Sequence, residues 1–531
     1  MKSRLLKAAG LIGGLTLISR ILGMSRDILS AKSFGTTWQW DALIYAFMLP
    51  NFMRRLVGEG AISSAFIPIY AEVMEKEGEP AAFRFGNIVF TLLSCGLIGF
   101  LAFLEFFLFL ALKNFSLAPE LHLIGRLLQV LFPYLFFIAL SALAAGIQNC
   151  HHRFFSASLS PLILDLVWIA AVLWICPLGG PRAEDRVFWL ALCLLISGVF
   201  QLAAQVPSLF QLGYFPRFEF DLRHPGLRKI GKLFLPSLLG FAVMQINVLV
   251  DMTMGLWVGP GANSSLWYGN RLMQFPLGVF AIAMGTAVLP ALSRQTARKE
   301  IEEAKKTLSF ALRTIFFIIL PSTVGLIALR TPIVRLLFER GEFDAVSTAR
   351  TSFVVLCYTI GLFAYSGQKI IVTGFYSLQD TKTPMKVGAA ALVMNIILNV
   401  LLMIPLKEGG LALATSISGI FNFLFLVYLF DRRVAAFPRR EIFASSVKIF
   451  GASLGMGGFA WIAFEKIYPL LGGGETFRLL AGVFSSMGAS VLIYLGLCLL
   501  FRVSEVREAV RWFRESRKKS EVSESVGEEP F

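Results

Sequence analysis

The chain has 531 residues, of which 56% are hydrophobic and 16% are charged, and its formal net charge at pH 7 is +15. Soluble globular chains carry about 25% charged residues, so this composition excludes a water-soluble domain and indicates an integral membrane protein. The mean hydropathy of +0.70 also indicates a membrane protein. The positive charge does not by itself indicate a nucleic-acid partner, because membrane proteins concentrate Lys and Arg in the loops of one side.

About fourteen apolar stretches recur along the chain, each long enough to cross a hydrocarbon layer as a helix. The first contains Arg20, Arg26 and Asp27 and lacks a small-residue cleavage site, so we expect a retained helix and not a signal peptide. The sequence therefore predicts an all-α integral membrane protein. The predicted spans are 8–33, 39–72, 86–112, 121–149, 158–176, 187–213, 230–258, 263–292, 308–329, 349–376, 385–405, 409–431, 442–465 and 477–501.

The basic residues of the loops indicate the orientation of these spans. Dense Lys and Arg clusters occur in 217–232, 294–306 and 432–440, which all lie on one side in the predicted order of spans. The turns of the other side, such as 33–40, are nearly uncharged. Because Lys and Arg favour the cytoplasmic side, both termini are predicted to be cytoplasmic.

A weak internal repeat has an offset of about 222 to 228 residues. The second predicted span ends Phe66-Ile67-Pro68, and the eighth ends Val288-Leu289-Pro290. A duplicated six-helix unit predicts two lobes in the same orientation, with the cargo path between them. The predicted parts are a first lobe (1–215), a second lobe (216–435), a helix hairpin (436–505), and a basic amphipathic stretch with an acidic tail (506–531).

Charged residues at bilayer depth carry the functional prediction. Arg20 lies near the middle of the first span, and an ionised arginine there costs at least about 2.5 kcal/mol unless it meets a partner or a cavity. At helical spacing the first span has one polar stripe of Ser19, Gly23, Arg26 and Ser30 and a second of Thr16, Arg20, Gly23 and Asp27. The second span adds Asp41, Arg54, Arg55 and Glu59, and the eighth adds Arg271 and Gln274 beside Pro276, a potential helix break.

Two interpretations of these charges stay open at this point. In the first they pair structurally, Arg55 with Glu59, Arg20 with Asp27, and Arg26 with Asp41. In the second the guanidiniums face a cavity and bind phosphate in a bidentate manner, which suits Arg better than Lys. Arginines outnumber acids in these segments, so the second interpretation predicts a transporter for an anionic cargo.

Several motifs resemble the MurJ (MviN) family of lipid II flippases over about residues 5–505. The motifs are Ser19-Arg20-Ile21-Leu22-Gly23-Met24-Ser25-Arg26-Asp27, Leu49-Pro50-Asn51-Phe52-Met53-Arg54-Arg55, Arg271-Leu272-Met273-Gln274-Phe275-Pro276 and Asp380-Thr381-Lys382-Thr383-Pro384. The resemblance implies two six-helix lobes plus two extra helices. It also implies transport of undecaprenyl-pyrophosphate-linked peptidoglycan precursor across the bacterial cytoplasmic membrane, with the hairpin forming a groove for the polyprenyl tail.

The resemblance also implies residue roles. Arg20, Arg26, Arg54 and Arg271 match the arginines that hold the cargo, together with Asp27, Asp41 and Gln274, although some members have Glu at the last position. A sodium site in some relatives matches Asp251, Asn395, Asn399 and Thr415, for which hydrogen bonding between helices is the alternative. Apart from this sodium ion, no cofactor is predicted.

Other functions are weighed against this one. A flippase for another polyprenyl-linked saccharide, or a cation exporter, would keep the fold, but an exporter of cations would need buried acids in excess. A membrane-embedded polyprenyl-phosphate glycosyltransferase would need an acid at the outer surface, where Glu184, Asp185, Glu342 and Asp344 lie outside any recognisable motif. A scaffold without cargo is a further alternative. We predict a monomeric transporter that is not an enzyme, binds lipid II and membrane lipids, and has no nucleic-acid partner.

Overall fold

The computed structural model describes the backbone of residues 2–433 and 439–506, and within these ranges all side chains except those of 2–13, 16, 57–61, 63, 235–244, 433 and 439. Every regular element among these residues is a helix, so the predicted all-α class is confirmed. The chain forms two compact units. The first unit comprises Met1–Ser264 and Phe338–Ser347, and the second comprises Ser265–Leu337 and Thr348–Phe531.

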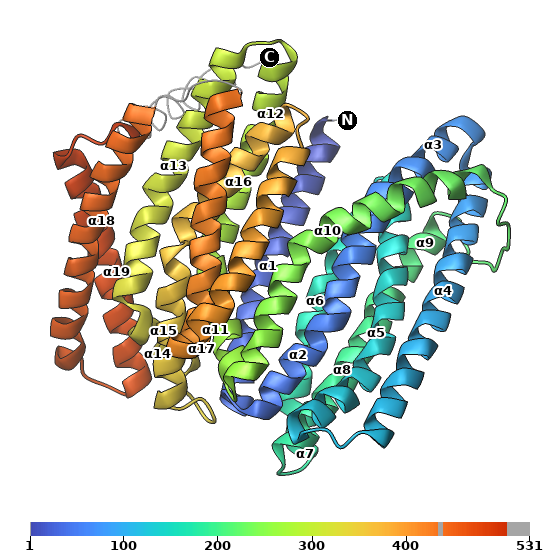
Figure 1. The fold of residues 1–531 in the computed structure, drawn as a ribbon, viewed down its shortest axis with the longest axis horizontal. Helices are drawn as coiled ribbons and strands as arrows, with labels where there is room; N and C mark the ends of the chain where they lie inside the picture. Colours follow the sequence, from blue (N-terminus) through green and yellow to red (C-terminus); the bar gives the residue numbers. More distant parts are fainter. Residues whose placement is uncertain (1, 434–438, 507–531) are drawn as a thin grey trace, which may run out of the picture. The chain divides into compact units, whose positions relative to one another are not determined.

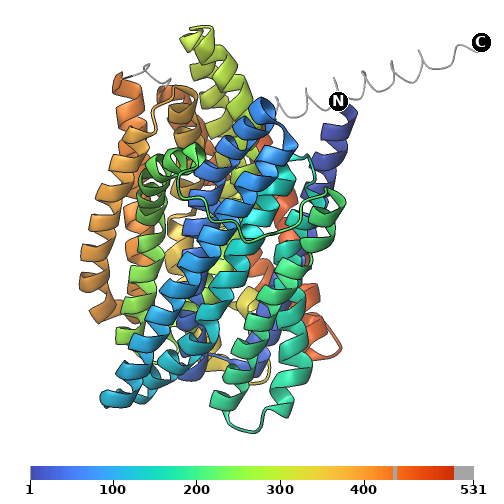
Figure 2. The ribbon, with the colours of Figure 1, turned by 90° about the vertical axis from the view of Figure 1, so that its right-hand side faces the viewer.

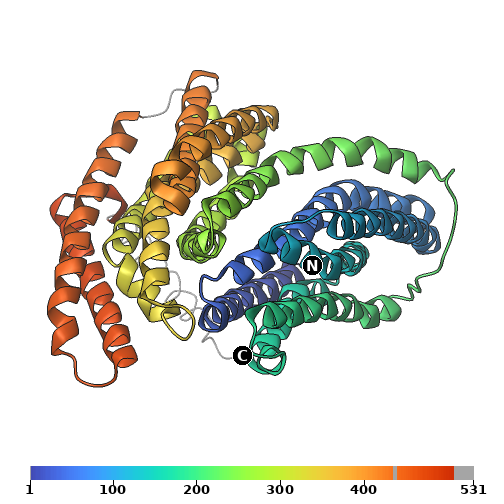
Figure 3. The same ribbon diagram turned by 60° about the horizontal axis from the view of Figure 1, so that its bottom comes forward.

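The first unit holds the helices from α1 to α10 (Figure 1). Its α-helices are α1 (Lys2–Phe34), α2 (Trp38–Arg54), α3 (Ile67–Glu77), α4 (Glu79–Asn114), α5 (Pro119–Cys150), α6 (Phe155–Ala170), α7 (Cys176–Leu178), α8 (Ala183–Ala203), α9 (Val206–Gln211) and α10 (Pro225–Val258). Two π-helical segments, η1 (Arg55–Phe66) and η2 (Ala171–Ile175), continue α2 and α6. Figure 3 shows α10 as a long, curved green helix.

The second unit contains α11 from Ser265 onward and the helices that follow, except Phe338–Ser347, which belongs to the first unit. These are α11 (Ala262–Pro276), η3 (Leu277–Ala281), α12 (Ile282–Ala297), α13 (Ile301–Ala328), α14 (Arg330–Phe338), α15 (Ala345–Ile360), α16 (Leu362–Ser377), α17 (Lys382–Arg433), α18 (Arg439–Ile467), η4 (Tyr468–Leu470) and α19 (Glu475–Leu500). Lys407 has φ of 50° inside α17, which therefore consists of two helices across a kink. The two predicted spans 385–405 and 409–431 lie on either side of that kink.

Each predicted span falls on one helix or on consecutive helices. Nine helices among the described residues are long and apolar enough to cross a membrane, or ten when α15 and α16, bent by 40°, count as one span. The protein therefore crosses a membrane several times. The residues 507–531, which hold most of the predicted basic stretch and acidic tail, lie outside the described residues, as do 434–438, where the hairpin was predicted to begin.

Two prolines at equivalent positions of the predicted repeat lie close to π-helical segments. Pro50 lies inside α2, which continues as η1 from Arg55, and Pro276 ends α11, which continues as η3 from Leu277. A proline cannot donate its i→i−4 hydrogen bond and crowds the preceding turn, and a π-turn lets the helix continue past such a site. The sequence suggested a helix break at Pro276, but the helix continues through it as η3. The division into lobes remains a prediction.

Within the first unit α5 is the central helix. It packs on α2, α4 and α8, and 61% of its apolar segment is buried against 11% for α4. Figure 2 shows α4 and α5 side by side. Since α4 has high hydropathy and little of its apolar segment is buried, its exposed apolar surface suits contact with lipid.

Within the second unit α13 lies between the hairpin of α18 and α19 and the pair α12 and α16 (Figure 1). Glycines allow the closest approaches: a Cβ on Gly457 of α18 would overlap Val324 of α13, and one on Gly367 of α16 would overlap Phe423 of α17. Small residues commonly mediate helix packing in membranes, where van der Waals contact replaces the hydrophobic effect between helices.

The connection from α9 to α10 is extended and is attached to α4. The backbone N–H of Arg217 donates to Asn87 (3.1 Å), and that of Glu219 donates to Thr91 (2.9 Å). Asn87 and Thr91 are one helical turn apart and both buried. Figure 2 shows the connection as a thin green trace that crosses helices of the first unit.

The end of α1 is joined to the segment that precedes α15. The backbone N–H of Glu342 donates to the carbonyl of Lys32 (2.9 Å), and the hydroxyls of Thr36 and Ser347 are 2.8 Å apart. Gly35 has φ of +56°, and a Cβ there would overlap the carbonyl of Glu342. Gly35 is thus required both by its backbone conformation and by the close approach.

We predict that Gly35→Ala lowers the free energy of unfolding by more than about 2 kcal/mol, because the methyl group adds backbone overlap to the strain of positive φ. Gly213→Ala is the control: Gly213 has φ of +78° with no atom near the added Cβ, so it should lose only the backbone term of about 1 kcal/mol. Thermal unfolding in detergent measures both. Equal losses would show that the approach to Glu342 contributes nothing.

Candidate functional site

One polar stripe of α1 packs against α6 in the first unit. Ser19 donates to Asp165 (3.4 Å), Arg26 donates to Asp165 (2.8 Å), and Ser30 accepts a hydrogen bond from the indole of Trp168 (3.0 Å). These are the side-chain-bearing polar members of the predicted stripe, and Gly23 lies between them, next to the Asp165 carboxylate. The predicted periodicity is confirmed, and the partner helix is α6.

Arg26 is held by two carboxylates. Its Nη1 donates to Asp165 Oδ1 (2.8 Å), while its Nη2 and Nε donate to Asp27 Oδ1 at 3.0 and 3.1 Å. All three residues are buried, with Arg26 6% and Asp27 1% exposed. A buried guanidinium requires paired charge of this kind, since a lone ion in a low-dielectric interior is very costly.

An aromatic wall surrounds this ion cluster. The guanidinium of Arg26 lies over the Trp168 ring, 4.6 Å from its centroid. Trp168 in turn packs edge-on against Trp40 and Phe47 of α2, and Trp40 stacks on Phe34 at the end of α1. The negative face of the indole adds attraction for the cation, and the rings exclude water from it. We call Arg26, Asp27 and Asp165 the ion cluster.

One predicted pair is wrong, because Arg26 pairs with Asp27 and Asp165 and not with Asp41. Asp27, the predicted partner of Arg20, pairs with Arg26, and Arg20 is half-buried. Asp165 was missed by the sequence analysis, although a lone acid inside the predicted span 158–176 is the same signal that drew attention to Arg26. Within the ion cluster acids outnumber arginine, opposite to the charge balance expected from the sequence.

Asp41 has a different environment from the arginines. It accepts hydrogen bonds from the backbone N–H groups of Gly261 (2.5 Å) and Ser264 (2.6 Å) and from the Ser264 hydroxyl. The first N–H groups of a helix have no partner within it, and the helix dipole favours an anion there. Asp41 of α2 therefore caps the start of α11.

Arg54 and Arg55 lie where α2 becomes π-helical. Arg54 donates to Asn51 one turn earlier (2.9 Å), and Arg55 donates to Gln245 of α10 (3.1 Å). The predicted partner of Arg55 was Glu59, whose side chain lies outside the described residues. Both arginines are half-buried, which agrees with a polar environment within the span.

Arg271 and Gln274 belong to α11 in the second unit. The Arg271 guanidinium lies over the Trp267 ring, 5.6 Å from its centroid, and Gln274 is exposed and donates to Asn270 one turn earlier. Their role in cargo binding remains a prediction.

The residues of the predicted sodium site divide between the units. Asp251 lies in the first unit, is buried and accepts from Asn247 (3.5 Å). In the second unit Asn399 donates to Asn395 (3.0 Å), and Asn395 donates to Thr415 (3.3 Å). Carboxylate, amide and hydroxyl oxygens suit a hard cation, but hydrogen bonds between helices also explain the three neutral residues. Sodium therefore remains a prediction, which equal transport with and without sodium at fixed membrane potential would remove.

The acids considered for a glycosyltransferase have structural contacts. Asp344 accepts from the backbone N–H and the hydroxyl of Ser347, both at 2.8 Å, at the start of α15. These hydrogen bonds hold the pKa of Asp344 below its ordinary value, which favours a capping carboxylate over a general acid. Glu184 and Asp185 lie in the first turn of α8, where the helix dipole favours them.

Comparison with known proteins identifies the family. The family model described as "Lipid II flippase MurJ" matches residues 30–482. The chain belongs to the MurJ family. A "Probable lipid II flippase MurJ" of Vibrio cholerae is 33% identical over 84% of this chain and 88% of its own length. A "Lipid II flippase MurJ" of Burkholderia cenocepacia is 30% identical over 86% of this chain and 90% of its own length.

Solved structures agree with the MurJ assignment. A structure described as "Lipid II flippase MurJ, inward closed conformation" matches with a TM-score of 0.75 and 30% identity, covering 94% of this chain and 99% of that one. A multidrug resistance MATE family transporter of the MOP superfamily in an inward-facing conformation matches with a TM-score of 0.64 at 16% identity, over 78% of this chain and 94% of its own. The second likeness is one of fold alone.

We predict that Arg26→Ala lowers the free energy of unfolding by about 3 to 5 kcal/mol, because it leaves two buried carboxylates without their cation. The double variant Arg26→Ala/Asp165→Ala should lose less than the sum of the single variants, with a coupling of about 1 to 3 kcal/mol, measured by unfolding in detergent. The control is the exposed pair Glu303 and Lys306, 2.8 Å apart, whose removal should show no measurable coupling. Additive losses at Arg26 and Asp165 would contradict the ion cluster.

Proposed function

We propose that this chain is a lipid II flippase, which moves the undecaprenyl-pyrophosphate-linked peptidoglycan precursor from the inner to the outer leaflet of a bacterial cytoplasmic membrane. The observation that carries the proposal is membership of the MurJ family over residues 30–482. The protein acts as a monomer with cytoplasmic termini, needs no nucleic acid and catalyses no covalent step. Alternating access of the two predicted lobes accounts for transport without one.

The ion cluster suggests how a pyrophosphate is held. Arg26 presents a planar fork of N–H donors, and Asp165 and Asp27 occupy that fork as a phosphate would. In this proposal the pyrophosphate replaces Asp165, which belongs to another helix, while Asp27 stays beside Arg26. Arg20 and Arg54 of the first unit and Arg271 of the second supply the remaining positive charge.

This exchange also explains release of the cargo. A guanidinium without a partner in a dry interior would hold a pyrophosphate very tightly, since bringing it back to an unpaired state is costly. Return of the Asp165 carboxylate offsets that cost, because the arginine exchanges one oxyanion for another of similar geometry. Asp165 is therefore a positioning residue whose carboxylate competes with the cargo.

Depletion of this protein in its host tests the function. Lipid II should accumulate in the inner leaflet, so the fraction accessible to an external probe should fall, and unchanged accessibility would contradict the proposal. If depletion left lipid II accessible but lowered the external accessibility of another polyprenyl-linked saccharide, the result would favour the alternative cargo.

In the same assay Arg271→Ala should lower the rate of lipid II appearance at the outer face by at least about tenfold, through loss of a charge-assisted contact with phosphate. Arg298→Ala, an exposed arginine at the end of α12, is the matched control and should transport normally. Normal transport by both variants would remove Arg271 from the site.

The proposed exchange predicts opposite effects of two variants on cargo binding. Arg26→Ala should weaken binding of lipid II in detergent, whereas Asp165→Asn should tighten it by about tenfold, because the amide competes less well for the guanidinium. Both variants should lose stability, so binding separates the two roles. Weaker binding by Asp165→Asn would show that Asp165 supports the cargo site and does not compete with the cargo.

A further inference from the structure

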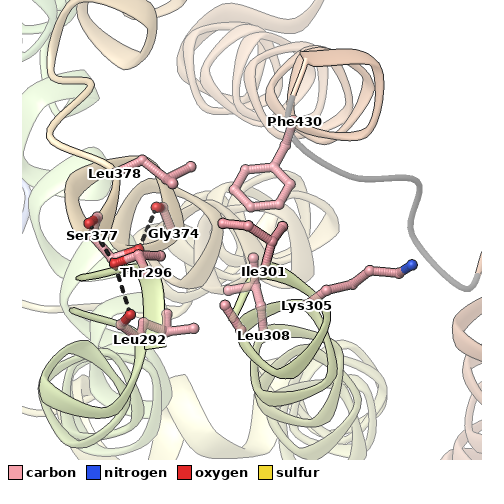
Figure 4. A pocket seen from close by; sticks show the side chains of 10 residues that line it. Leu292, Thr296, Ile301, Lys305, Leu308, Gly374, Ser377, Leu378 and Phe430 are labelled. Carbon is pink, nitrogen blue, oxygen red and sulfur yellow. Dashed lines mark hydrogen bonds between the residues drawn. The ribbon is translucent and has the colours of Figure 1, made fainter. Parts of the chain in front are cut away.

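A cavity of about 720 Å³ opens in the second unit where α13, α14, α18 and α19 meet. Its polar lining consists of Arg330, Thr331, Arg335, Glu465 and the rings of Trp461 and Tyr468. Cavities of this size hold small ligands. By contrast, the cavity between α12, α13, α16 and α17 has about 10 Å³, room for a single water. The single proton of its Thr296 hydroxyl already has an acceptor, since the carbonyls of Leu292 and Ser377 both lie within hydrogen-bond distance (Figure 4).

The larger cavity has a firm apolar base. Leu336 of α14 and Leu479 and Val483 of α19 are buried together, with Ile333, Phe464 and Tyr468 packed on them. Phe464 and Tyr468 stack with their ring centroids 5.3 Å apart. The polar groups are therefore mounted on packed helices, which keeps their spacing fixed.

The cationic side of the cavity comes from α14. Arg330 is half-buried and donates one N–H to the carbonyl of Ile327 (2.7 Å), which leaves other donors of its fork for a ligand. Arg335 lies about one and a half turns further along α14 and is paired with Glu475 of α19. Thr331 adds a hydroxyl between them, at the end of α14 where the helix dipole also favours an anion.

The acidic group and one of the aromatic rings come from α18. Glu465 is exposed and supplies a carboxylate, and one turn earlier Trp461 is 57% exposed. Trp and Tyr favour the boundary between hydrocarbon and headgroups, where the ring is apolar and its N–H or O–H is wet. The cavity lies where α13 and α18 end, so it is at headgroup depth, and the predicted orientation assigns it to the outer leaflet.

We propose that this cavity binds the headgroup of a zwitterionic phospholipid, with the phosphate on Arg330 and Arg335 and the primary ammonium on Glu465. A guanidinium pairs with phosphate in a planar, bidentate manner, and a carboxylate accepts from an ammonium. The lining carries both signs of charge, which fits a lipid that carries both and fits an anionic lipid less well. The residues of this cavity belong to the second unit, whereas Arg26, Asp27 and Asp165 belong to the first, and the headgroup site does not rest on the proposed function.

The surroundings favour a lipid over a free phosphate compound. Trp461, Phe477 and Leu480 of the hairpin are exposed large apolar side chains, so acyl chains can continue from the cavity along them. A free headgroup would leave that apolar surface uncovered. A bound lipid would contact both the hairpin and the α13–α14 pair, and would hold them together as a ligand does.

Delipidated protein in detergent, titrated with phosphatidylethanolamine and phosphatidylglycerol and followed by native mass spectrometry, tests this site. Phosphatidylethanolamine should bind more tightly. Arg330→Gln should weaken both lipids by about tenfold, whereas Glu465→Gln should weaken phosphatidylethanolamine by about tenfold and leave phosphatidylglycerol unchanged or tighter. Arg298→Gln and Glu300→Gln, both exposed and distant in sequence from the cavity, are the matched controls.

Three outcomes would overturn the proposal. The first is retention of phosphatidylethanolamine by Arg330→Gln and Glu465→Gln at the level of the controls. The second is an equal effect of Glu465→Gln on both lipids, which removes the ammonium contact. The third is binding of soluble phosphoethanolamine or inorganic phosphate as tightly as the whole lipid, which would make this a free-anion site.

Discussion

A guanidinium inside the hydrocarbon layer must be neutralised before its helix can remain inserted, and in this protein Asp27 and Asp165 neutralise Arg26. This pairing determines the packing around it. It requires α6 to face the polar stripe of α1, and it places the Trp168 ring over the cation. The insertion of the other, apolar helices then depends on their hydropathy alone, because the charge of Arg26 is already neutralised by its neighbours.

The same pairing limits what the arginine can do. An arginine with open donors would bind any oxyanion, whereas an oxyanion that reaches Arg26 would first have to displace a carboxylate already bonded to it. Selectivity for an oxyanion would then depend on the difference in free energy between its pair with Arg26 and the pair of Arg26 with the carboxylate, and not on the strength of either pair alone. Asp41 is the complementary case, because this acid was predicted to accompany the cargo arginines and instead caps α11.

The helices could be predicted from the sequence, because a long apolar segment in a membrane must satisfy its backbone hydrogen bonds within itself, and a helix does so. The sequence also predicted the stripe of Ser19, Arg26 and Ser30, since helical periodicity is local. The partners were not predictable in the same way: Asp165 lies 139 residues from Arg26, and without a contact map any acid in a span was eligible. The π-turns near Pro50 and Pro276 were also missed, because a proline signals strain but not how the helix relieves it.

The connection between α9 and α10 has a consequence for backbone dynamics. The segment around residues 215–222 has no helix and exposes Phe218, Phe220 and Leu222, so its side chains resemble those of a mobile loop. Two of its backbone amides differ from those of a mobile loop, because the N–H groups of Arg217 and Glu219 donate to the buried side chains of Asn87 and Thr91 in α4. Those two amides should exchange their hydrogens slowly, on the timescale of the opening of the first unit, while their neighbours exchange fast.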